Sequence, residues 1–350
     1  MSKRTRIFST VYGLALATAI VYNPFHSVQA KAAPSTWVEG KAECVMEVNS
    51  RRILYASNAD QRLPMASTTK ILTAATVLEE TEDLEEVFPI PQEAVGVEGS
   101  SVYLQTGDEY SIKELLYGLM LRSGNDCAVA LATHTSGSVE RFSAKMNETA
   151  MKAGALESCF LNPHGLPEKG HYTTAKDLSL ITCYAMQNPV FAEIVSTRYY
   201  EPRNWLNKNK TLTRYEGGIG VKTGYTKEAG RCLVSAANRN GMTLVCSVLH
   251  CPTTYERSFQ LLDDAFASYE YVPIVKQGET LTLLANDKKI SVYVDKTYSY
   301  PLLQEEKALI EIKTSSHIES PERKKKGEIV GQFEIYLLKR LLFLGNLYKL

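Results

Sequence analysis

The chain has 350 residues, of which 44% are hydrophobic and 22% are charged, an ordinary balance for a globular protein that is long enough for two domains. Its 39 lysines and arginines are matched by 39 aspartates and glutamates, so no net charge points to nucleic-acid binding. The composition therefore excludes a protein that acts through its overall charge, and function has to be sought in local motifs.

The first residues have the order of a secretory signal peptide. Lys3, Arg4 and Arg6 precede the apolar run IFSTVYGLALATAIVYNPF, and a segment with small residues, SVQA, follows it. A single membrane anchor is the alternative, but the uninterrupted apolar core at 11–22 is short for a span, which needs ~20 residues. We therefore expect residues 1–30 to be a signal peptide and the mature protein to be exported.

The helices of the chain follow a pair of strands. Residues 42–58 are predicted to form two short strands around the turn NSRR. Apolar residues at helical spacing predict a helix at 66–80. Ser111 and Glu114 have the spacing of a capping box ahead of the apolar run LLYGLMLRS. Further helices are predicted at CAVALATHT, 138–153 and 174–187.

From residue 231 the pattern changes to strands. The segment RCLVSAANRNGMTLVCSVL reads as two strands joined through NRNG, and a helix is predicted at TTYERSFQLLDDAFASYEY. The strands before and after the helices are therefore expected to form one antiparallel sheet with helices packed on it.

The segment after Pro273 predicts a small all-β domain. LTLLAN, ISVYVD and ALIEIKT alternate as short strands, and RKKKGE reads as a solvated turn. The last stretch, IVGQFEIYLLKRLLFLGNLYKL, is either a membrane-surface helix or a β-hairpin that turns near LKR. On a helical wheel its polar residues do not form one face, which favours the hairpin.

The seven cysteines are an odd number, and no pair has CxxC spacing. Most lie in apolar runs such as CAVALA and TLVCSVL, which favours buried, unpaired side chains. A disulfide framework, which an exported chain permits, and a metal site are the alternatives. The cysteines are Cys44, Cys127, Cys159, Cys183, Cys232, Cys246 and Cys251.

The segment PMASTTKILTAAT places Ser67 and Lys70 at the start of the helix predicted at 66–80, where residues three apart share a face. A serine hydroxyl is a weak nucleophile that needs a base. A lysine can be that base when burial or a nearby cation lowers its pKa. Taken alone, this pattern fits a solvated helix surface better than a catalytic site.

Two other short motifs carry polar groups that could serve the same site. The segment SGND at 123–126 lies between two predicted helices, where a plain turn is the simpler interpretation. GVKTGYT, which contains Lys222 and Gly224, precedes a predicted strand. Lys222 can hold an anionic group of a substrate, and Gly224 leaves room for a substrate backbone beside an edge strand.

Together the three motifs are far more specific than each alone. Ser67, Ser123 and Lys222 occur in the order S-x-x-K, S-x-N, K-T-G, the signature of serine penicillin-recognising enzymes. With NPHGL, GHYTTAKDL and GVKTGYTKEAGRCLVSAA, the chain resembles the low-molecular-mass penicillin-binding proteins of peptidase S11 type, which act as D-alanyl-D-alanine carboxypeptidases. The resemblance spans about residues 37–350.

The resemblance implies an α+β fold of the serine β-lactamase and penicillin-binding-protein type. It comprises an antiparallel sheet with helices on it and an all-helical lobe, followed by a small all-β domain. The implied division is a signal peptide at 1–30, a catalytic domain at 31–273 and a β-rich domain at 274–350.

The resemblance also implies catalytic roles. Ser67 is expected to attack the carbonyl between two D-alanines and form an acyl-enzyme, and Lys70 to take its proton. Ser123 is expected to relay protons toward the leaving group. Asn125 is expected to hold the substrate amide.

Substrate-binding roles fall on the strand of the K-T-G motif. Lys222 and Thr223 are expected to bind the terminal carboxylate, next to Gly224, and the backbone N–H of Tyr225 to form an oxyanion hole with that of Ser67. Arg257 falls where the family has an arginine for the carboxylate, although a place on the helix surface explains it equally well.

The chain departs from the family at two positions. Ile219 stands where an aspartate usually precedes the K-T-G lysine by three residues, and Cys127 stands where many members have alanine. The first puts a local turn or hydrogen bond in doubt, and neither touches the expected chemistry.

The alternatives share part of the signature. A D,D-endopeptidase or transpeptidase of the same fold remains open. A β-lactamase is less favoured, because Glu157 lies five residues before Asn162, whereas a deacylating glutamate is expected four before an asparagine. A Ser–His–Asp hydrolase lacks a usable histidine motif here. An inactive wall-binding homologue would not need the intact triple.

The expected partners follow from the resemblance. The substrate is peptidoglycan stem peptide ending in D-Ala-D-Ala, and β-lactam antibiotics are covalent inhibitors. No nucleic acid, metal or organic cofactor is implied. The expected location is at the wall or the outer face of the cytoplasmic membrane of a bacterium, where the C-terminal domain could contact membrane or wall.

Overall fold

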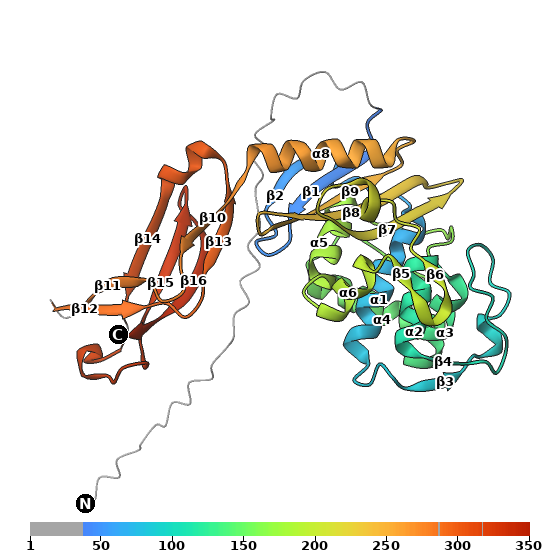
Figure 1. Cartoon of the computed structure of the whole chain (residues 1–350), viewed down its shortest axis with the longest axis horizontal. Helices are drawn as coiled ribbons and strands as arrows, with labels where there is room; N and C mark the ends of the chain where they lie inside the picture. Colours follow the sequence, from blue (N-terminus) through green and yellow to red (C-terminus); the bar gives the residue numbers. More distant parts are fainter. Residues whose placement is uncertain (1–37, 286–287, 317) are drawn as a thin grey trace, which may run out of the picture. The chain divides into compact units, whose positions relative to one another are not determined.

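The computed structural model describes residues 38–285, 288–316 and 318–350 (Figure 1). The signal peptide expected at 1–30 lies outside the described residues. Within them, every helix is too short or too polar to cross a membrane.

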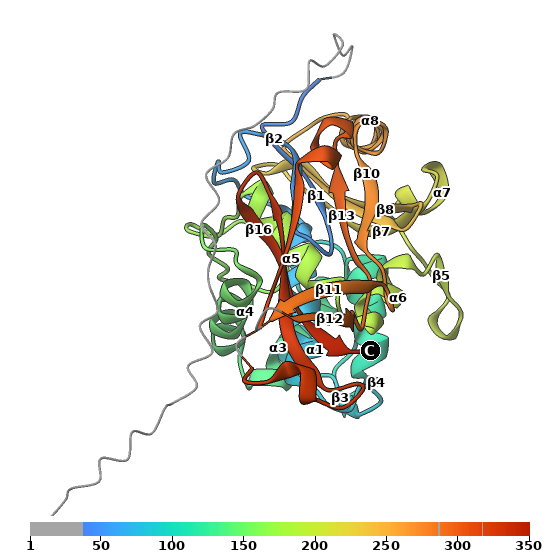
Figure 2. The ribbon, with the colours of Figure 1, turned by 90° about the vertical axis from the view of Figure 1, so that its left-hand side faces the viewer.

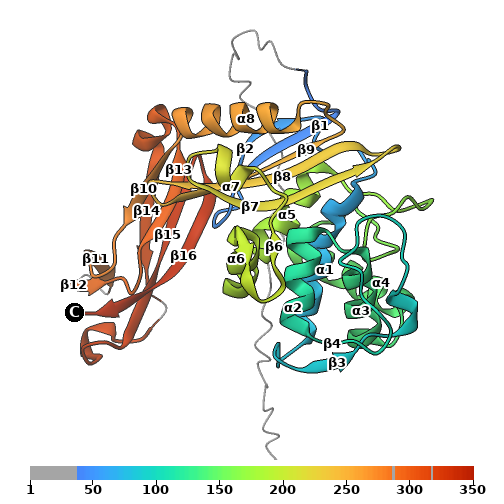
Figure 3. The same cartoon turned by 45° about the vertical axis from the view of Figure 1, so that its right-hand side comes forward.

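A five-stranded antiparallel sheet is the framework of the N-terminal part, with the strand order β2-β1-β9-β8-β7. It confirms the strand pair predicted at 42–58 and the one predicted around NRNG, and it joins both into one sheet through the pairing of β1 with β9. Strand β7 is at the edge of the sheet (Figure 3). The strands are β1 (Ala42–Glu47), β2 (Ile53–Ser57), β7 (Gly218–Thr226), β8 (Gly230–Arg239) and β9 (Met242–Leu249).

Both faces of this sheet are covered, which explains the continuous apolar run TLVCSVL of β9. Helix α8 (Thr254–Ser268) packs on one face, with Leu244, Cys246 and Val248 beneath it (Figure 1). Val245 and Leu249 face the opposite side, where they join the larger core beneath the remaining helices. Polar side chains that lie on the larger-core side of the sheet can therefore be buried, including catalytic ones.

The helical lobe begins with a 3₁₀ turn, η1 (Ala66–Thr69), which leads into α1 (Lys70–Glu80). The predicted capping box of Ser111 and Glu114 is present at the start of α2. Helix α6 was not predicted. The other elements are α2 (Ile112–Tyr117), the π turn η3 (Gly118–Arg122), α3 (Asn125–Ser136), α4 (Val139–Ala153), α5 (Ala175–Ala185), α6 (Pro189–Ser196) and α7 (Thr211–Arg214).

Short strands and turns complete this lobe. Two ribbons of paired short strands connect the helices. They and the short 3₁₀ turns are β3 (Val87–Pro89), η2 (Gln92–Ala94), β4 (Glu109–Ser111), β5 (Tyr199–Tyr200), η4 (Glu201–Arg203) and β6 (Trp205–Leu206).

The C-terminal part has a five-stranded antiparallel sheet, in the order β11-β12-β16-β15-β14, and a two-stranded sheet of β10 and β13 (Figure 2). The hairpin predicted near LKR is confirmed by the pairing of β15 with β16. The elements are β10 (Glu270–Val275), β11 (Thr280–Ala285), β12 (Lys288–Tyr293), β13 (Tyr298–Leu302), η5 (Gln304–Leu309), β14 (Ile310–Ser315), η6 (Pro321–Arg323), β15 (Ile329–Leu337) and β16 (Arg340–Lys349).

Strand β10 spans the domain boundary expected after residue 273. Because it pairs with β13, the whole strand belongs with the C-terminal sheets. We propose that the β-rich domain begins at Glu270, four residues earlier than the start at residue 274 expected from the sequence.

All seven cysteines are free thiols; six are buried and Cys159 is half-buried. The prediction of buried cysteines is therefore confirmed for six of the seven, and all seven are unpaired. Burial, and then the neighbouring Asp126, raise the pKa of the Cys127 thiol well above its usual value, so this thiol is protonated and unreactive.

Leu347 and Leu344 lie on opposite faces of β16 and give a matched test of the C-terminal hairpin. Leu347 is 0% exposed and Leu344 is 54% exposed. We expect Leu347→Ala to lower the free energy of unfolding of this part by about 2–5 kcal/mol, and Leu344→Ala to change it by less than about 0.5 kcal/mol. Denaturant unfolding of both variants measures this, and equal losses would contradict the assigned faces.

Candidate active site

The turn that carries Ser67 has an unusual backbone. Ala66, immediately before it, is buried and has φ +50°, a left-handed conformation that alanine rarely adopts. Ser67 follows within η1, and its half-buried side chain faces Lys70. The strained backbone therefore lies next to the residue expected to be the nucleophile.

The amine of Lys70 is fully buried and contacts three oxygens. Its Nζ lies 3.1 Å from Ser67 Oγ, 2.6 Å from Asn125 Oδ1 and 2.7 Å from the backbone oxygen of His164. The last two oxygens can only accept hydrogen bonds, whereas the hydroxyl can also donate one. Two N–H bonds to these acceptors leave the lone pair of a neutral amine directed at Ser67.

The surroundings of Lys70 favour this neutral form. Burial, and then the nearby ammonium of Lys222, lower the pKa of Lys70 well below its usual value. The three atoms that contact Nζ carry no formal charge, so no ion pair offsets the loss of hydration. A lysine in this state can act as a general base.

A second pair of polar side chains joins Ser123 to Lys222. Lys222 Nζ donates to Ser123 Oγ at 3.0 Å and to its neighbour's backbone oxygen, that of Thr223, at 3.0 Å. Both Ser123 and Lys222 are buried, and burial, with a smaller effect of Lys208, lowers the pKa of Lys222 to about 7. Lys222 can therefore gain or lose its proton near neutral pH.

Asn125 links Lys70 to the loop before β4. Its Oδ1 accepts from Lys70, and its Nδ2 donates to the backbone oxygen of Glu98 at 2.5 Å. The neighbouring Asp126 anchors the same loop, because its Oδ2 accepts from Ser101 Oγ and from three backbone N–H groups at 102–104. Asn125 thus holds the lysine in place, and its amide has a second hydrogen that can serve a substrate carbonyl.

Strand β7 passes close to the Ser67 turn because Gly224 has no side chain. A Cβ at this position would lie 2.9 Å from Met65 O and 3.1 Å from Ser67 N. The room expected at Gly224 for a substrate backbone is thus taken up by the turn of the protein itself. Thr223 is half-buried on the same strand, and Tyr225 is exposed.

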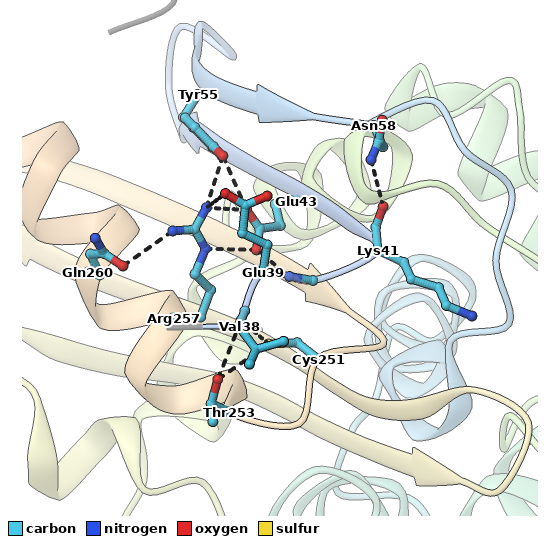
Figure 4. Close-up of polar contacts among 11 residues, drawn as sticks. Val38, Glu39, Lys41, Glu43, Tyr55, Asn58, Cys251, Thr253, Arg257 and Gln260 are labelled. Atoms are coloured by element: carbon cyan, nitrogen blue, oxygen red, sulfur yellow. Dashed lines mark hydrogen bonds and ion pairs between the residues drawn. The ribbon is translucent and has the colours of Figure 1, made fainter. Parts of the chain in front are cut away.

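The structure does not bring Arg257 to these groups. Arg257 lies on α8, in the layer on the opposite face of the sheet, where its guanidinium points between Glu43 and Tyr55 (Figure 4). Its Nε and Nη2 donate to the two carboxylate oxygens of Glu43 at 2.8 and 2.7 Å. Nη2 also donates to Tyr55 OH at 3.0 Å, and Nη1 donates to Gln260.

The expected carboxylate-binding role of Arg257 is therefore corrected to a structural one. Glu43 is 0% exposed and Arg257 is 4% exposed, so the pair is inaccessible to a substrate. Hydrogen bonds to Glu43 raise the pKa of Arg257, so it stays charged. The physical reason for the error is that the Arg257 side chain points from α8 to Glu43 on β1 and Tyr55 on β2, whereas Lys222 is on β7 at the other edge of the sheet.

Sequence reasoning did not assign three groups that support the site. The backbone oxygen of His164 accepts a hydrogen bond from Lys70. Thr69, the last residue of η1 (Ala66–Thr69, hereafter the nucleophile turn), is hydrogen-bonded to His171. The segments NPHGL and GHYTTAKDL contain both histidines and were part of the resemblance. A backbone acceptor has no residue type of its own, so only the motif itself could have indicated it.

The chain is similar to known proteins along most of its length. Residues 27–253 match the family model Peptidase_S11, D-alanyl-D-alanine carboxypeptidase. The chain is 33% identical over 278 residues to D-alanyl-D-alanine carboxypeptidase DacF of Bacillus subtilis, which covers 75% of this chain and 72% of that protein. It is 29% identical to DacC of Escherichia coli, over 95% of this chain and 89% of that protein.

A solved structure extends the similarity to the fold. Penicillin-binding protein 5 from Haemophilus influenzae superimposes with a TM-score of 0.72 at 25% identity, covering 91% of this chain and 98% of that one. The fold and site define a serine-type hydrolase of the penicillin-binding-protein class, which confirms the α+β fold expected from the sequence. The chain belongs to the S11 family of D-alanyl-D-alanine carboxypeptidases.

Removing the buried cation separates the structural from the substrate-binding role of Arg257. We expect Arg257→Met to lower the free energy of unfolding by about 3–5 kcal/mol, because Glu43 is left buried without its partner. The KM of the folded enzyme for a D-Ala-D-Ala peptide should stay unchanged. Denaturant unfolding and steady-state kinetics measure the two effects.

The double variant Arg257→Met/Glu43→Leu is the matched control, since it removes both charges and should regain much of the lost stability. A raised KM with unchanged stability would return Arg257 to the substrate site.

Proposed function

We propose that this carboxypeptidase removes the terminal D-alanine from peptidoglycan stem peptides ending in D-Ala-D-Ala, through an acyl-enzyme on Ser67. The observation that carries the proposal is the fully buried Lys70 amine, which has two acceptor-only oxygens and the Ser67 hydroxyl as its contacts. A neutral lysine next to a serine is a general base beside a nucleophile.

Acylation and deacylation then proceed in successive steps. Ser67 Oγ gives its proton to Lys70 Nζ and bonds to the carbonyl carbon of the penultimate D-alanine, whose π electrons move to the carbonyl oxygen. When the oxyanion collapses, the C–N bond breaks, and the leaving amine takes a proton from Lys70 directly or through Ser123. Water later attacks the ester with the same groups, which releases the shortened peptide and restores Ser67.

The oxyanion and the carboxylate are held by β7 and the Ser67 turn. The backbone N–H groups of Ser67 and Tyr225 form the oxyanion hole, a contribution of roughly 3–4 kcal/mol per donor in other acyl-transfer enzymes. Lys222 binds the terminal carboxylate with Thr223. A bound carboxylate offsets the cost of burying a charged Lys222, so substrate and proton bind this lysine together.

Asn125 contacts the substrate amide in this proposal while it holds Lys70. β-Lactam antibiotics acylate the same serine, because their strained amide and carboxylate mimic the D-Ala-D-Ala end. The enzyme acts outside the cytoplasm, at the wall or the outer face of the cytoplasmic membrane. Contact of the C-terminal β-rich domain with membrane or wall stays a prediction.

Ser67→Ala tests the nucleophile. We expect the variant to lose covalent labelling by a fluorescent penicillin and to release no D-alanine from a D-Ala-D-Ala tripeptide, because it lacks the attacking oxygen. Gel fluorescence and a D-alanine assay measure both activities, and an unchanged melting temperature shows that the fold is intact. Persistent label on the variant would remove Ser67 from the mechanism.

Lys222→Arg tests the charge at the carboxylate site. The pKa of Lys222 is about 7 in the free enzyme, so kcat/KM should fall as the pH rises through that value and Lys222 loses its charge. Arginine does not deprotonate in proteins, so the variant should be slower but should lack this descending limb. The readout is kcat/KM from pH 5 to 10, and an unchanged limb in the variant would assign it to another group.

A further inference from the structure

The carbonyl of the peptide unit between Ala66 and Ser67 accepts a side-chain hydrogen bond. Ala66 O accepts from Thr69 Oγ1 at 2.8 Å, and both residues are buried. Thr69 lies between Ser67 and Lys70 in the S-x-x-K motif and has no role assigned from the sequence. The bond fixes the carbonyl of a residue whose φ of +50° is otherwise unfavourable.

His171 is the next member of the same chain of hydrogen bonds. Its Nδ1 accepts from the backbone N–H of Leu161 at 3.0 Å, and its Nε2 lies 3.0 Å from Thr69 Oγ1. Burial, opposed by Glu168, lowers the pKa of His171 to about 4, so the ring is neutral at pH 7. Because Nδ1 accepts, the single proton is on Nε2, which donates to Thr69.

The direction of each bond is thereby determined. His171 Nε2–H donates to Thr69 Oγ1, and the Thr69 hydroxyl has its own hydrogen to donate to Ala66 O. His171 is 6% exposed and Phe160 packs edge-on to its ring, with ring centroids 5.8 Å apart. This series of hydrogen bonds therefore runs from the backbone N–H of Leu161 to the Ala66 carbonyl in the nucleophile turn.

These hydrogen bonds set the orientation of the Ser67 N–H. In a planar trans peptide the carbonyl and the following N–H point in opposite directions. Ala66 O faces Gly165, where a Cβ would lie 2.0 Å from it, whereas Ser67 N faces Gly224, where a Cβ would lie 3.1 Å from it. Holding the carbonyl on the Gly165 side thus directs the Ser67 N–H toward β7.

We propose that His171 and Thr69 are positioning residues for acyl transfer: by holding the Ala66 carbonyl, they orient the Ser67 backbone N–H as a donor of the oxyanion hole. The proposal rests on the proposed function, because it assigns a role within that acylation step. Neither residue needs to touch the substrate. Their effect should appear in the rate of bond formation and not in the binding that precedes it.

The test compares variants that keep or remove each hydrogen bond, with benzylpenicillin as the probe. Thr69→Val removes the hydroxyl at nearly constant shape, and Thr69→Ser keeps it. His171→Asn can accept from Leu161 but cannot reach Thr69, whereas His171→Gln places an N–H donor near the position of Nε2. Thr76→Val on α1 is the control, because Thr76 Oγ1 is buried and finds no hydrogen-bond partner among the described residues.

Stopped-flow measurements separate the acylation rate constant from the dissociation constant of the first complex. We expect Thr69→Val and His171→Asn to lower the rate constant tenfold or more, with the dissociation constant within threefold of wild type. Thr69→Ser and His171→Gln should keep at least a third of the rate, and Thr76→Val should match wild type. The double variant Thr69→Val/His171→Asn should be no slower than the slower single variant.

Acylation of Thr69→Val and His171→Asn within threefold of wild type would overturn the proposal, and so would an equal loss in Thr76→Val. If His171→Asn does not fold, the comparison of Thr69→Val with Thr69→Ser decides the outcome by itself. Failure of the proposed function looks different, because wild-type protein would then not be acylated at Ser67 at all.

Discussion

The burial of an amine beside a hydroxyl is the constraint on which the rest of the site depends. Removing an ammonium from water costs several kcal/mol, and an opposite charge in contact would normally offset this cost. Around Lys70 Nζ the protein supplies a hydroxyl, an amide oxygen and a backbone carbonyl instead. These groups suit a neutral amine, so the neutral form of Lys70, which can act as a base, is favoured over the charged form.

Each of these groups comes from a different segment, and the architecture exists to bring them together. The nucleophile turn and α1 provide Ser67 and Lys70, the start of α3 provides Asn125, and the NPHGL loop provides the carbonyl. Strand β7 then closes the site, since Gly224 lets it approach the turn. The second lysine, Lys222, is on this strand, where it lowers the pKa of Lys70; we propose that it also binds the carboxylate of the substrate.

The local structure was predictable from the sequence, because it depends on residues that are close together along the chain, as the motifs do. The capping box at Ser111, the hairpin around NRNG and the S-x-x-K spacing are local signals. The pairing of β10 with β13 and the choice of sheet face under α8 depend on packing between distant segments. That is why Arg257 was expected at the substrate and is found bonded to Glu43. The support from His171 to Thr69, 102 positions apart, was invisible for the same reason.

The rate of β-lactam acylation against pH, for wild type and Lys70→Arg, tests the central claim most directly. If Lys70 is a neutral base, wild-type acylation rises with pH through a pKa well below that of a free lysine. The arginine variant cannot accept the proton and should be slower by roughly 10²–10⁴-fold, the usual contribution of a general base. An arginine variant that acylates near the wild-type rate, with the same pH profile, would contradict the account.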